Sequence, residues 1–569
     1  MDDIFKTENI EKFGAVETQS GSKIKLEKLP LKYGSRRQQD QMLDTFKKAV
    51  NNDTKFILLD APVGSGKSFA VVMMQNWFLE NIDKGAKFHV LTATKTLQQQ
   101  YVDDFDFVQN IWGANNYHCE KYECSCETGK ELNKASKNKC EGCPYDDARN
   151  NFINGTVGLT NYHMFILYTM FVKDHNADSG SSHILNPGPF KGKKVLFLDE
   201  AHEFEGVLCD FITVKVSKNI LTKIGMDEKP ATVYDGKLKN IKHISQLVDL
   251  VETHLLEDLT TLRENVKTGE KDRKKAAEQM EEIDELIVKL DVFMHEYDES
   301  PDNWIIESTI PVSKKGDSKG YVEMSAQPIW SNIYLDKYVW SQYDHIVMLS
   351  GTFLDKTVTC YLNGLDSSKC EYLYLDSTFP IENRKIFYMP VAKMNYDNKK
   401  QAFDQMIPWI KKILAKNAGK KGIIHTVSFE LARWIQENIK DDRLLFHDSA
   451  NRDLVLRKHT ASEKDTVLCS PSMHTGVDLK DDLSRFQIII KIPYPSLGSE
   501  KIKKRKDIYP DYYSYATVSD IVQSYGRSIR SETDYAETYI LDSSFDFVQK
   551  YSGRFIPKYF KAAIHKIKI

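Results

Sequence analysis

Residues 56–80 combine the residue types that bind the phosphates of a nucleotide. A short apolar run is followed by a glycine-rich turn with a Lys-Ser pair, and then by apolar residues at helical spacing. Between a strand and a helix, such a turn directs backbone N–H groups at phosphates, while its lysine reaches the β- and γ-phosphates and its serine binds Mg²⁺. The alternative is a plain surface turn, and Ala61 stands where the common pattern has its first glycine. The residues predicted to bind ATP and Mg²⁺ here are Gly64, Ser65, Gly66, Lys67 and Ser68.

Two adjacent carboxylates, Asp199 and Glu200, follow an apolar run at 195–198. Acids that come directly after a buried strand lie at the carboxyl edge of an α/β sheet, where ligands bind. We expect Asp199 to hold Mg²⁺ and Glu200 to orient and polarise the attacking water; the alternative is that both acids cap a helix. Together with Lys67, the pair predicts a protein that hydrolyses ATP.

Motifs of the same kind follow in the second half of the chain. Three apolar runs between 345 and 490 each adjoin polar or glycine-containing turns, which predicts a second α/β unit. Further on, "QSYGRSIR" contains Gln523 and two arginines spaced three residues apart. We expect Arg527 and Arg530 to project from one helix face and to stabilise transition-state charge across a cleft; a solvated helix face is the alternative.

Five of the nine cysteines lie in one lysine-rich segment, residues 119–145. From the residues alone, disulfides, zinc, an iron–sulfur cluster and coincidence are all candidates, although Cys-x2-Cys spacing slightly favours zinc. Because so short a segment cannot enclose an apolar core, we expect a metal centre to hold it together. The five are Cys119, Cys124, Cys126, Cys140 and Cys143, whereas Cys209, Cys360, Cys370 and Cys469 are scattered and are expected to be buried thiols.

The bulk properties are those of a multidomain globular protein. The chain has 569 residues, 41% of them hydrophobic, and a formal net charge of −3, so a nucleic acid would have to bind in a local groove. The basic run "KIKKRK" at 501–506 is interpreted as a solvated loop, with a nucleic-acid contact as the alternative. The acidic start is no signal peptide, and no run of eighteen apolar residues occurs. We expect a cytoplasmic protein without membrane contact, nuclear if eukaryotic and in the host cytoplasm if viral.

Taken in order, the motifs resemble those of the XPD/DinG family of superfamily 2 DNA helicases. The matching segments between Arg36 and Asp542 are "APVGSGKS", "TATKTLQQQ", "DEAH", "SGTF", "TGVD" and "QSYGRSIR". The resemblance implies an α/β fold with two RecA-like P-loop motor domains and ATP in the cleft between them. It also implies an ATP-dependent DNA helicase that moves 5′ to 3′ on single-stranded DNA and unwinds duplex, forked or R-loop substrates in repair, replication or recombination. The rival functions are a translocase that displaces proteins or R-loops without efficient unwinding, and an ATP-switched scaffold subunit.

The same resemblance assigns roles to individual residues. Arg36 and Gln39 resemble the motif on the adenine side of the nucleotide. Where the family often has Glu-Gly before its motif aspartate, this chain reads Thr-Gly-Val before Asp478. Expected partners are single-stranded DNA and its junctions with duplex, bound by a monomer. The implied DNA-backbone contacts are Thr92, Thr94 and Gln98; the coupling elements are Gly351, Thr352 and Asp478; and the γ-phosphate sensor and arginine fingers are Gln523, Arg527 and Arg530.

The cysteine-rich segment lies where the family inserts a 4Fe–4S domain, between "TATKTLQQQ" and "DEAH". The resemblance therefore implies a cluster held by Cys119, Cys140 and Cys143, with Cys124 as the fourth ligand and Cys126 possible in its place; zinc is the less favoured occupant. Apolar residues at helical spacing, 244–262 and 280–294, predict a helical hairpin that resembles the family's arch domain. The expected domains are a first motor domain (1–112, 151–204 and 321–355), an iron–sulfur domain (113–150), an arch-like domain (205–320) and a second motor domain (356–569).

Overall fold

The computed structural model describes residues 36–136, 141–170, 193–217, 241–268, 272–309, 323–395, 397–473, 479–529 and 531–568, together with residues 220 and 477. Three predicted site residues, Cys140, Asp478 and Arg530, lie outside the described residues. Among the helices that the structure describes, none is both long enough and apolar enough to cross a membrane.

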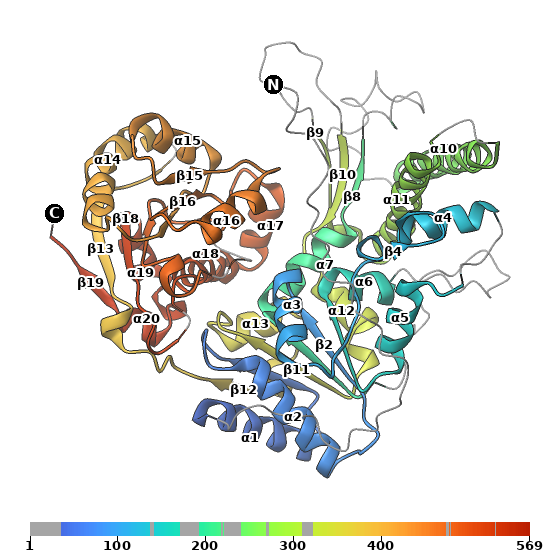
Figure 1. Ribbon diagram of the computed structural model, residues 1–569, viewed down its shortest axis with the longest axis horizontal. Coiled ribbons are helices and arrows are strands. Elements are labelled where there is room, and N and C mark those ends of the chain that lie inside the picture. Colours follow the sequence, from blue (N-terminus) through green and yellow to red (C-terminus); the bar gives the residue numbers. More distant parts are fainter. Residues whose placement is uncertain are drawn as a thin grey trace.

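The first motor domain is built on a parallel seven-stranded sheet in the order β12-β1-β11-β7-β2-β6-β3 (Figure 1). Its central strands are apolar on both faces because helices cover both sides of the sheet. Alternate residues of β1 enter different cores, with Leu58 on one face and Ile57 and Leu59 on the other. The strands are β1 (Phe56–Asp60), β2 (Phe88–Thr92), β3 (Gln109–Asn110), β6 (Val157–Asn161), β7 (Val195–Asp199), β11 (His345–Ser350) and β12 (Cys370–Tyr374). The helices are α1 (Arg37–Asn51), α2 (Lys67–Asn81), α3 (Lys95–Asp104), α5 (Pro144–Asn154), α6 (Tyr162–Met170), α7 (Phe204–Ile212), α12 (Asn332–Tyr338) and α13 (Lys356–Leu362).

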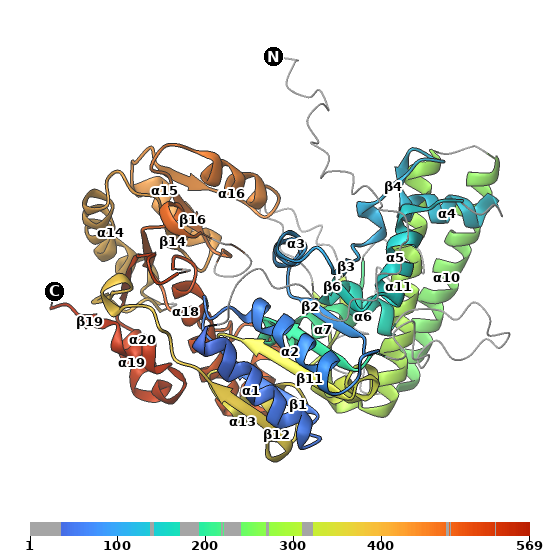
Figure 2. The ribbon, with the colours of Figure 1, turned by 60° about the horizontal axis from the view of Figure 1, so that its bottom comes forward.

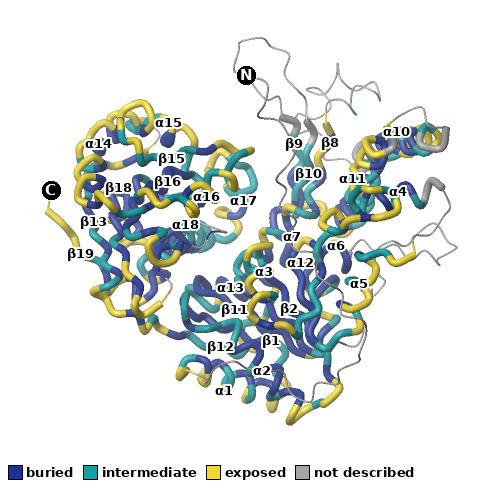
Figure 3. The backbone as a smooth tube through the Cα atoms, viewed as in Figure 1, coloured by how far each residue is buried: buried dark blue, intermediate teal, exposed yellow. Residues whose placement is uncertain are grey.

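The second motor domain has its own parallel seven-stranded sheet, in the order β15-β16-β14-β17-β18-β13-β19. The central strands of both sheets are buried, whereas the outward faces of the covering helices are exposed (Figure 3). Two parallel sheets covered by helices confirm the predicted fold class. The strands are β13 (Ile386–Ala392), β14 (Gly422–His425), β15 (Leu444–Phe446), β16 (Val467–Ser470), β17 (Phe486–Ile489), β18 (Glu537–Asp542) and β19 (Ile564–Lys566). The helices are α14 (Lys399–Lys416), α15 (Phe429–Asn438), α16 (Arg452–Ala461), α17 (Glu500–Ile508), α18 (Pro510–Tyr525), α19 (Phe545–Tyr551) and α20 (Lys558–Ala562).

The boundary expected at residue 355 is too early. Strand β12 pairs in parallel with β1, with Phe56 opposite Cys370 and Asp60 opposite Tyr374. The chain therefore completes the first sheet through residue 374, and α13 also precedes the crossing into the second sheet. No local pattern marks this boundary, because a strand at the edge of one sheet resembles the first strand of the next sheet.

The arch-like region is a helical hairpin, as its apolar spacing predicts. Helix α10 (Ile241–Thr268) and helix α11 (Arg273–Glu299) pack against each other, and Asp272 caps α11 by accepting a hydrogen bond from the backbone N–H of Lys274. A three-stranded antiparallel sheet in the order β8-β10-β9 accompanies the hairpin and was not predicted. Its strands are β8 (Val214–Val216), β9 (Trp304–Thr309) and β10 (Glu323–Pro328).

The cysteine-rich insertion consists of two short strands and a helix that lies beside the hairpin (Figures 1 and 2). Its elements are β4 (His118–Cys119), β5 (Cys124–Ser125) and α4 (Cys126–Ser136). The expectation that no apolar core supports this insertion is wrong, because Leu132 of α4 is buried in a core shared with both hairpin helices. In addition, Lys274 Nζ donates to the carbonyl of Glu123 over 2.7 Å. The hairpin members of the shared core are Leu259, Leu262, Ala276, Ala277 and Met280.

Candidate active site

The phosphate loop joins β1 to α2, and its backbone requires glycine at two positions. Gly64 (φ 80°) and Gly66 (φ 77°) both adopt the left-handed conformation. A Cβ added to Gly66 would lie 2.0 Å from Nε2 of Gln39, so no other residue fits there. Gln39 in turn donates to the Gly66 carbonyl over 3.4 Å and accepts from the backbone N–H of Arg36 over 2.7 Å. The predicted adenine-side residues therefore lie directly against the phosphate loop.

Lys67 and the two carboxylates meet at the carboxyl edge of the first sheet, where β11 lies between β1 and β7. Lys67 Nζ lies 3.4 Å from Oε1 of Glu200 and 3.5 Å from the carbonyl of Ala61. Asp199 is 3% exposed; burial raises its pKa above the usual range, and the charge of Lys67 opposes this. Glu200 has φ 58°, a left-handed conformation that is costly for a residue with a side chain and is found mainly at functional sites.

Two tyrosines that the sequence did not single out hold Asp199. The phenol of Tyr101 donates to Asp199 Oδ2 over 3.1 Å, and that of Tyr162 donates to the Asp199 carbonyl over 2.7 Å. Burial, followed by the nearby charge of Asp199, raises the pKa of both phenols, so both remain donors. No local pattern marks them, because each comes from a helix remote in sequence from the aspartate.

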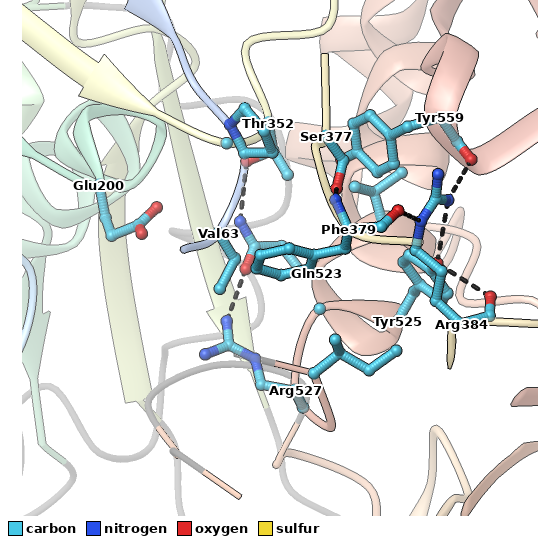
Figure 4. A pocket seen from close by; sticks show the side chains of 15 residues that line it. Val63, Glu200, Thr352, Ser377, Phe379, Arg384, Gln523, Tyr525, Arg527 and Tyr559 are labelled. Atoms are coloured by element: carbon cyan, nitrogen blue, oxygen red, sulfur yellow. Dashed lines mark hydrogen bonds between the residues drawn. The ribbon is translucent and has the colours of Figure 1, made fainter. Parts of the chain in front are cut away.

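The second motor domain closes the site from the opposite side (Figure 4). Gln523 Nε2 donates to Thr352 Oγ1 over 2.8 Å and lies 3.0 Å from Nε2 of His202. Arg527 Nη2 donates to Oε1 of Gln523 over 2.5 Å, and Nη1 donates to the carbonyl of Val477 over 3.1 Å. The pocket is lined by Glu200 and Thr352 from one domain and by these two side chains from the other.

Arg527 does not project from a helix face as expected. Helix α18 ends at Tyr525, and Gly526 follows as its C-terminal cap, so Arg527 lies in the turn beyond. The turn directs the guanidinium back toward Gln523. Helical spacing alone overlooked the glycine that ends the helix.

His202 connects the two carboxylates to the second domain. Its Nδ1 lies 2.8 Å from Ser350 Oγ, and its Nε2 lies within reach of both Gln523 and Glu203. Burial disfavours the charged imidazole, but the hydrogen bond and charge of Glu203 outweigh burial and raise the pKa of His202. A change at the carboxylates can therefore pass through one ring to Gln523.

The far end of the pocket holds an arginine that sequence reasoning missed. Arg384 is 4% exposed and donates from Nε to the Phe379 carbonyl over 2.9 Å and from Nη1 to the Tyr559 carbonyl over 2.5 Å. Tyr525 also lines this end of the pocket (Figure 4). The sequence around Arg384 has no recognisable motif, so only the fold brings it to the cleft.

Two of the three expected DNA contacts are inside the protein. Thr92 and Gln98 are both fully buried. Gln98 donates to the Asn110 side chain and the Ile111 carbonyl and accepts from Asn161, so its amide is committed to internal hydrogen bonds. Their expected role as direct DNA contacts is therefore corrected to one of holding α3 on the sheet. Thr94 is partly exposed and caps α3 by accepting from the backbone N–H of Leu97 over 3.2 Å.

The described cysteines of the insertion form a thiol cluster that favours Cys126 over Cys124. Cys126 Sγ lies 3.9 Å from Cys143 Sγ; burial, followed by the charges of Cys143 and Cys119, raises the pKa of the Cys126 thiol. Cys119 is also buried, and its Sγ would lie 2.8 Å from a Cβ on Gly129. Cys124 instead packs with the core shared by the insertion and the hairpin. Cys126 thus lies beside Cys143, and Cys119 is close enough for its charge to act on the Cys126 thiol; thiolates of this kind are the ligands of zinc ions and of iron–sulfur clusters.

Comparisons with known proteins agree with this geometry. One family model, described as "Type III restriction enzyme, res subunit", matches residues 32–226, and another, "Helicase C-terminal domain", matches residues 412–562. The curated "ATP-dependent DNA helicase CHL1" of Candida albicans is 22% identical over 460 residues, covering 62% of this chain and 53% of that protein. The protein of the same name from Kluyveromyces lactis is 23% identical over 146 residues, covering 21% of this chain and 18% of that protein. The chain thus spans about half the length of the first relative.

Solved structures share the whole fold. An XPD helicase superposes with a TM-score of 0.58 at 17% identity, covering 94% of this chain and 100% of that one. Xpd4 of S. tokodaii superposes with a TM-score of 0.53 at 13% identity and the same coverage. In the order of its motifs, its two family-model matches, its CHL1 relatives and its fold, the chain is similar to the XPD/DinG-type helicases of superfamily 2.

Proposed function

We propose that the protein is an ATP-dependent DNA helicase that moves along single-stranded DNA, 5′ to 3′, and unwinds duplex or forked substrates. The observation that carries the proposal is the cleft between the motor domains. There, Lys67 and Glu200 of the first domain face Gln523 and Arg527 of the second. Such a cleft lets one nucleotide hold two domains together.

Each side chain has a place in ATP hydrolysis. Lys67 binds the β- and γ-phosphates, and Ser68 with Asp199 provides oxygen ligands for Mg²⁺, which neutralises phosphate charge. Glu200 orients the attacking water, and Arg527 offsets the charge that develops on the γ-phosphate. Because Gln523 bonds to Thr352 and lies beside His202, loss of that phosphate changes the contacts between the domains. Alternate closing and opening of the cleft then steps the protein along the strand.

The thiol cluster is proposed to hold a 4Fe–4S cluster through Cys119, Cys126, Cys143 and Cys140, with zinc as the alternative. The buried thiols of Cys119 and Cys126, and the contact between Cys126 and Cys143, support the assignment. Thiolates and the cluster together add negative charge. Lys130, whose Nζ lies 3.6 Å from the centre of the Tyr145 ring, is close enough to offset part of it. The group would fasten α4 to the strands that precede it.

Two assays test the proposal. Single-stranded DNA should stimulate ATP hydrolysis, and the protein should unwind a duplex with a 5′ single-stranded tail but neither one with a 3′ tail nor a blunt duplex. Preference for a 3′ tail would reverse the proposed direction. Stimulated ATPase activity without unwinding of any tailed duplex would favour the rival translocase, whereas partner binding that is independent of hydrolysis would favour the scaffold.

A further inference from the structure

Arg505 is buried between the two motor domains, although it belongs to the basic run interpreted above as a solvated loop. Its side chain is 5% exposed, and that of its partner Glu205 is 7% exposed. Nη2 lies 2.7 Å from Oε1 of Glu205 and Nη1 lies 3.1 Å from Oε2, the two-pronged geometry that arginine forms with carboxylates. The remaining basic side chains of α17 are exposed or only partly buried, so Arg505 has a separate role.

Both charged groups are fully supported by neighbours. Arg505 Nε donates to the Ile329 carbonyl over 2.6 Å, and its guanidinium carbon lies 4.4 Å from the centre of the Trp330 ring. Glu205 Oε1 also accepts from the backbone N–H of Ser331 over 3.1 Å. A buried ion pair persists only when its desolvation is offset by such hydrogen bonds and ring contacts.

An aromatic cluster surrounds the pair and spans the domain boundary. Trp330 packs edge-on against Tyr361 and Tyr512, at ring-centre distances of 5.4 and 5.3 Å. Tyr361 stacks on Tyr509 at 4.2 Å. Trp330 and Tyr361 precede the crossing into the second sheet, whereas Tyr509 and Tyr512 follow it, so large apolar surfaces of both domains are in contact here.

This contact is connected to both walls of the ATP cleft by single helices. On the first domain, Glu205 lies in α7, which begins two residues after His202. On the second, Tyr512 and Gln523 lie on the same helix, α18, eleven residues or about 16 Å apart along its axis. Because a helix transmits rotation as a rigid rod, motion about the Arg505 contact moves Gln523 relative to His202.

We propose that the Arg505–Glu205 contact is the fixed pivot about which the motor domains close, and that Arg505 is a positioning residue for ATP hydrolysis. The inference rests on the proposed function, since the cleft it controls is the ATP site. The pivot stays closed while the opposite end of α18 delivers Gln523 and Arg527 to the nucleotide. Arg505 itself contacts neither ATP nor the reacting atoms.

The test compares Arg505→Met with Arg505→Lys, and uses Lys506→Met, an exposed neighbour on the same helix, as the matched control. With single-stranded DNA present, Arg505→Met should lower kcat about tenfold or more while the KM for ATP changes less than about threefold, because the phosphate loop lies wholly in the first domain. Arg505→Lys keeps the positive charge but loses the two-pronged contact with Glu205. Its kcat should therefore lie between those of Arg505→Met and wild type. Lys506→Met should match wild type.

A purely structural role predicts a lower Tm with unchanged kcat per folded molecule, and that result would overturn the proposal. If Arg505→Met does not fold, the double variant Arg505→Met/Glu205→Met removes the uncompensated carboxylate and should fold but keep the reduced kcat. If wild type itself hydrolyses no ATP, the proposed function is refuted, and hydrogen exchange then tests the pivot independently of activity. Exchange should then rise in α7 and residues 329–331 of Arg505→Met but not in β1; unchanged exchange in α7 would refute the pivot.

Discussion

At the ATP cleft, Lys67 begins helix α2, Glu200 follows strand β7 and Gln523 lies on helix α18, and all three elements belong to domains built on large sheets. In the cysteine-rich insertion, two-residue strands and one helix hold three thiols, and the apolar support comes from the neighbouring hairpin. The side chains of the motor cleft are thus supported by the cores of two domains. The structure of the insertion depends instead on the proposed metal centre and on the neighbouring hairpin. Removing a functional side chain should therefore cost activity in the first region and structure in the second.

The largest effect is expected at the phosphate loop. Lys67→Ala should lower the DNA-stimulated kcat for ATP by about 100-fold or more, because a preorganised charge that stabilises the transition state is lost. The Tm should stay within a few degrees of wild type, since the loop is held by Gln39 and not by the lysine. Lys47→Ala, at a partly buried lysine of α1 paired with Asp44, is the control. Unwinding that survives Lys67→Ala would contradict an ATP-driven motor.

The thiol cluster supplies the second comparison. Cys126→Ser should lose the bound metal and lower the Tm, whereas Cys124→Ser should retain the metal, because Cys126 Sγ lies 3.9 Å from Cys143 Sγ and Cys126 is the proposed ligand. Iron, acid-labile sulfide and zinc are measured on anaerobically purified protein. About four irons and four sulfides per chain identify the cluster, and one zinc without sulfide identifies the alternative. The opposite pattern for the two serine variants would restore Cys124 as the ligand.

The dependence of the insertion on the hairpin can be weakened without touching a thiol. Leu132→Ala removes the buried side chain through which α4 packs on α10 and α11, at a local cost of about 2 to 5 kcal/mol. Limited proteolysis should then cut the insertion faster while ATP hydrolysis stays near wild type. Equal cleavage of variant and wild type would show that the metal alone holds α4.

The smallest effect is a pH dependence within the motor scaffold. Burial raises the pKa of Asp60 to about 7, although Tyr372 donates to it over 3.0 Å. Between its ordinary value near 3.8 and 7, the folded protein holds a proton that the unfolded chain releases, so this residue's contribution to stability falls as pH rises. Asp60→Asn should equal wild type in Tm near pH 4 and exceed it at pH 8, while the exposed Asp44→Asn should show no difference. If the Tm of Asp60→Asn changes between pH 4 and pH 8 as much as the Tm of wild type does, another residue is responsible for the pH dependence.

How far the sequence predicts this molecule depends on the range of the contacts involved. The phosphate loop and the Asp199–Glu200 pair could be predicted because glycine conformation and strand-end position are local properties. The buried position of Gln98 could not be predicted, because it depends on hydrogen bonds with Asn110 and Asn161, which lie on other elements.

Other features that the sequence did not show have the same origin in distant contacts. Cys124 lies in β5 whereas Cys126 begins α4, and α4 packs against the hairpin, which is remote in sequence. In the sequence, Arg505 does not differ from the other basic residues around it. Its partner Glu205 is brought near only by the fold. The early domain boundary arose because β12 pairs with β1, more than 300 residues earlier in the chain.

The contact at Leu132 also has a topological consequence. The insertion and the hairpin leave the first motor domain separately and meet again at this contact, close to the turn between α10 and α11. Leu132 is therefore a second connection between two segments that are joined elsewhere only through the first domain. A displacement of the hairpin is transmitted to α4 directly at this contact, without passing through the sheet that carries both.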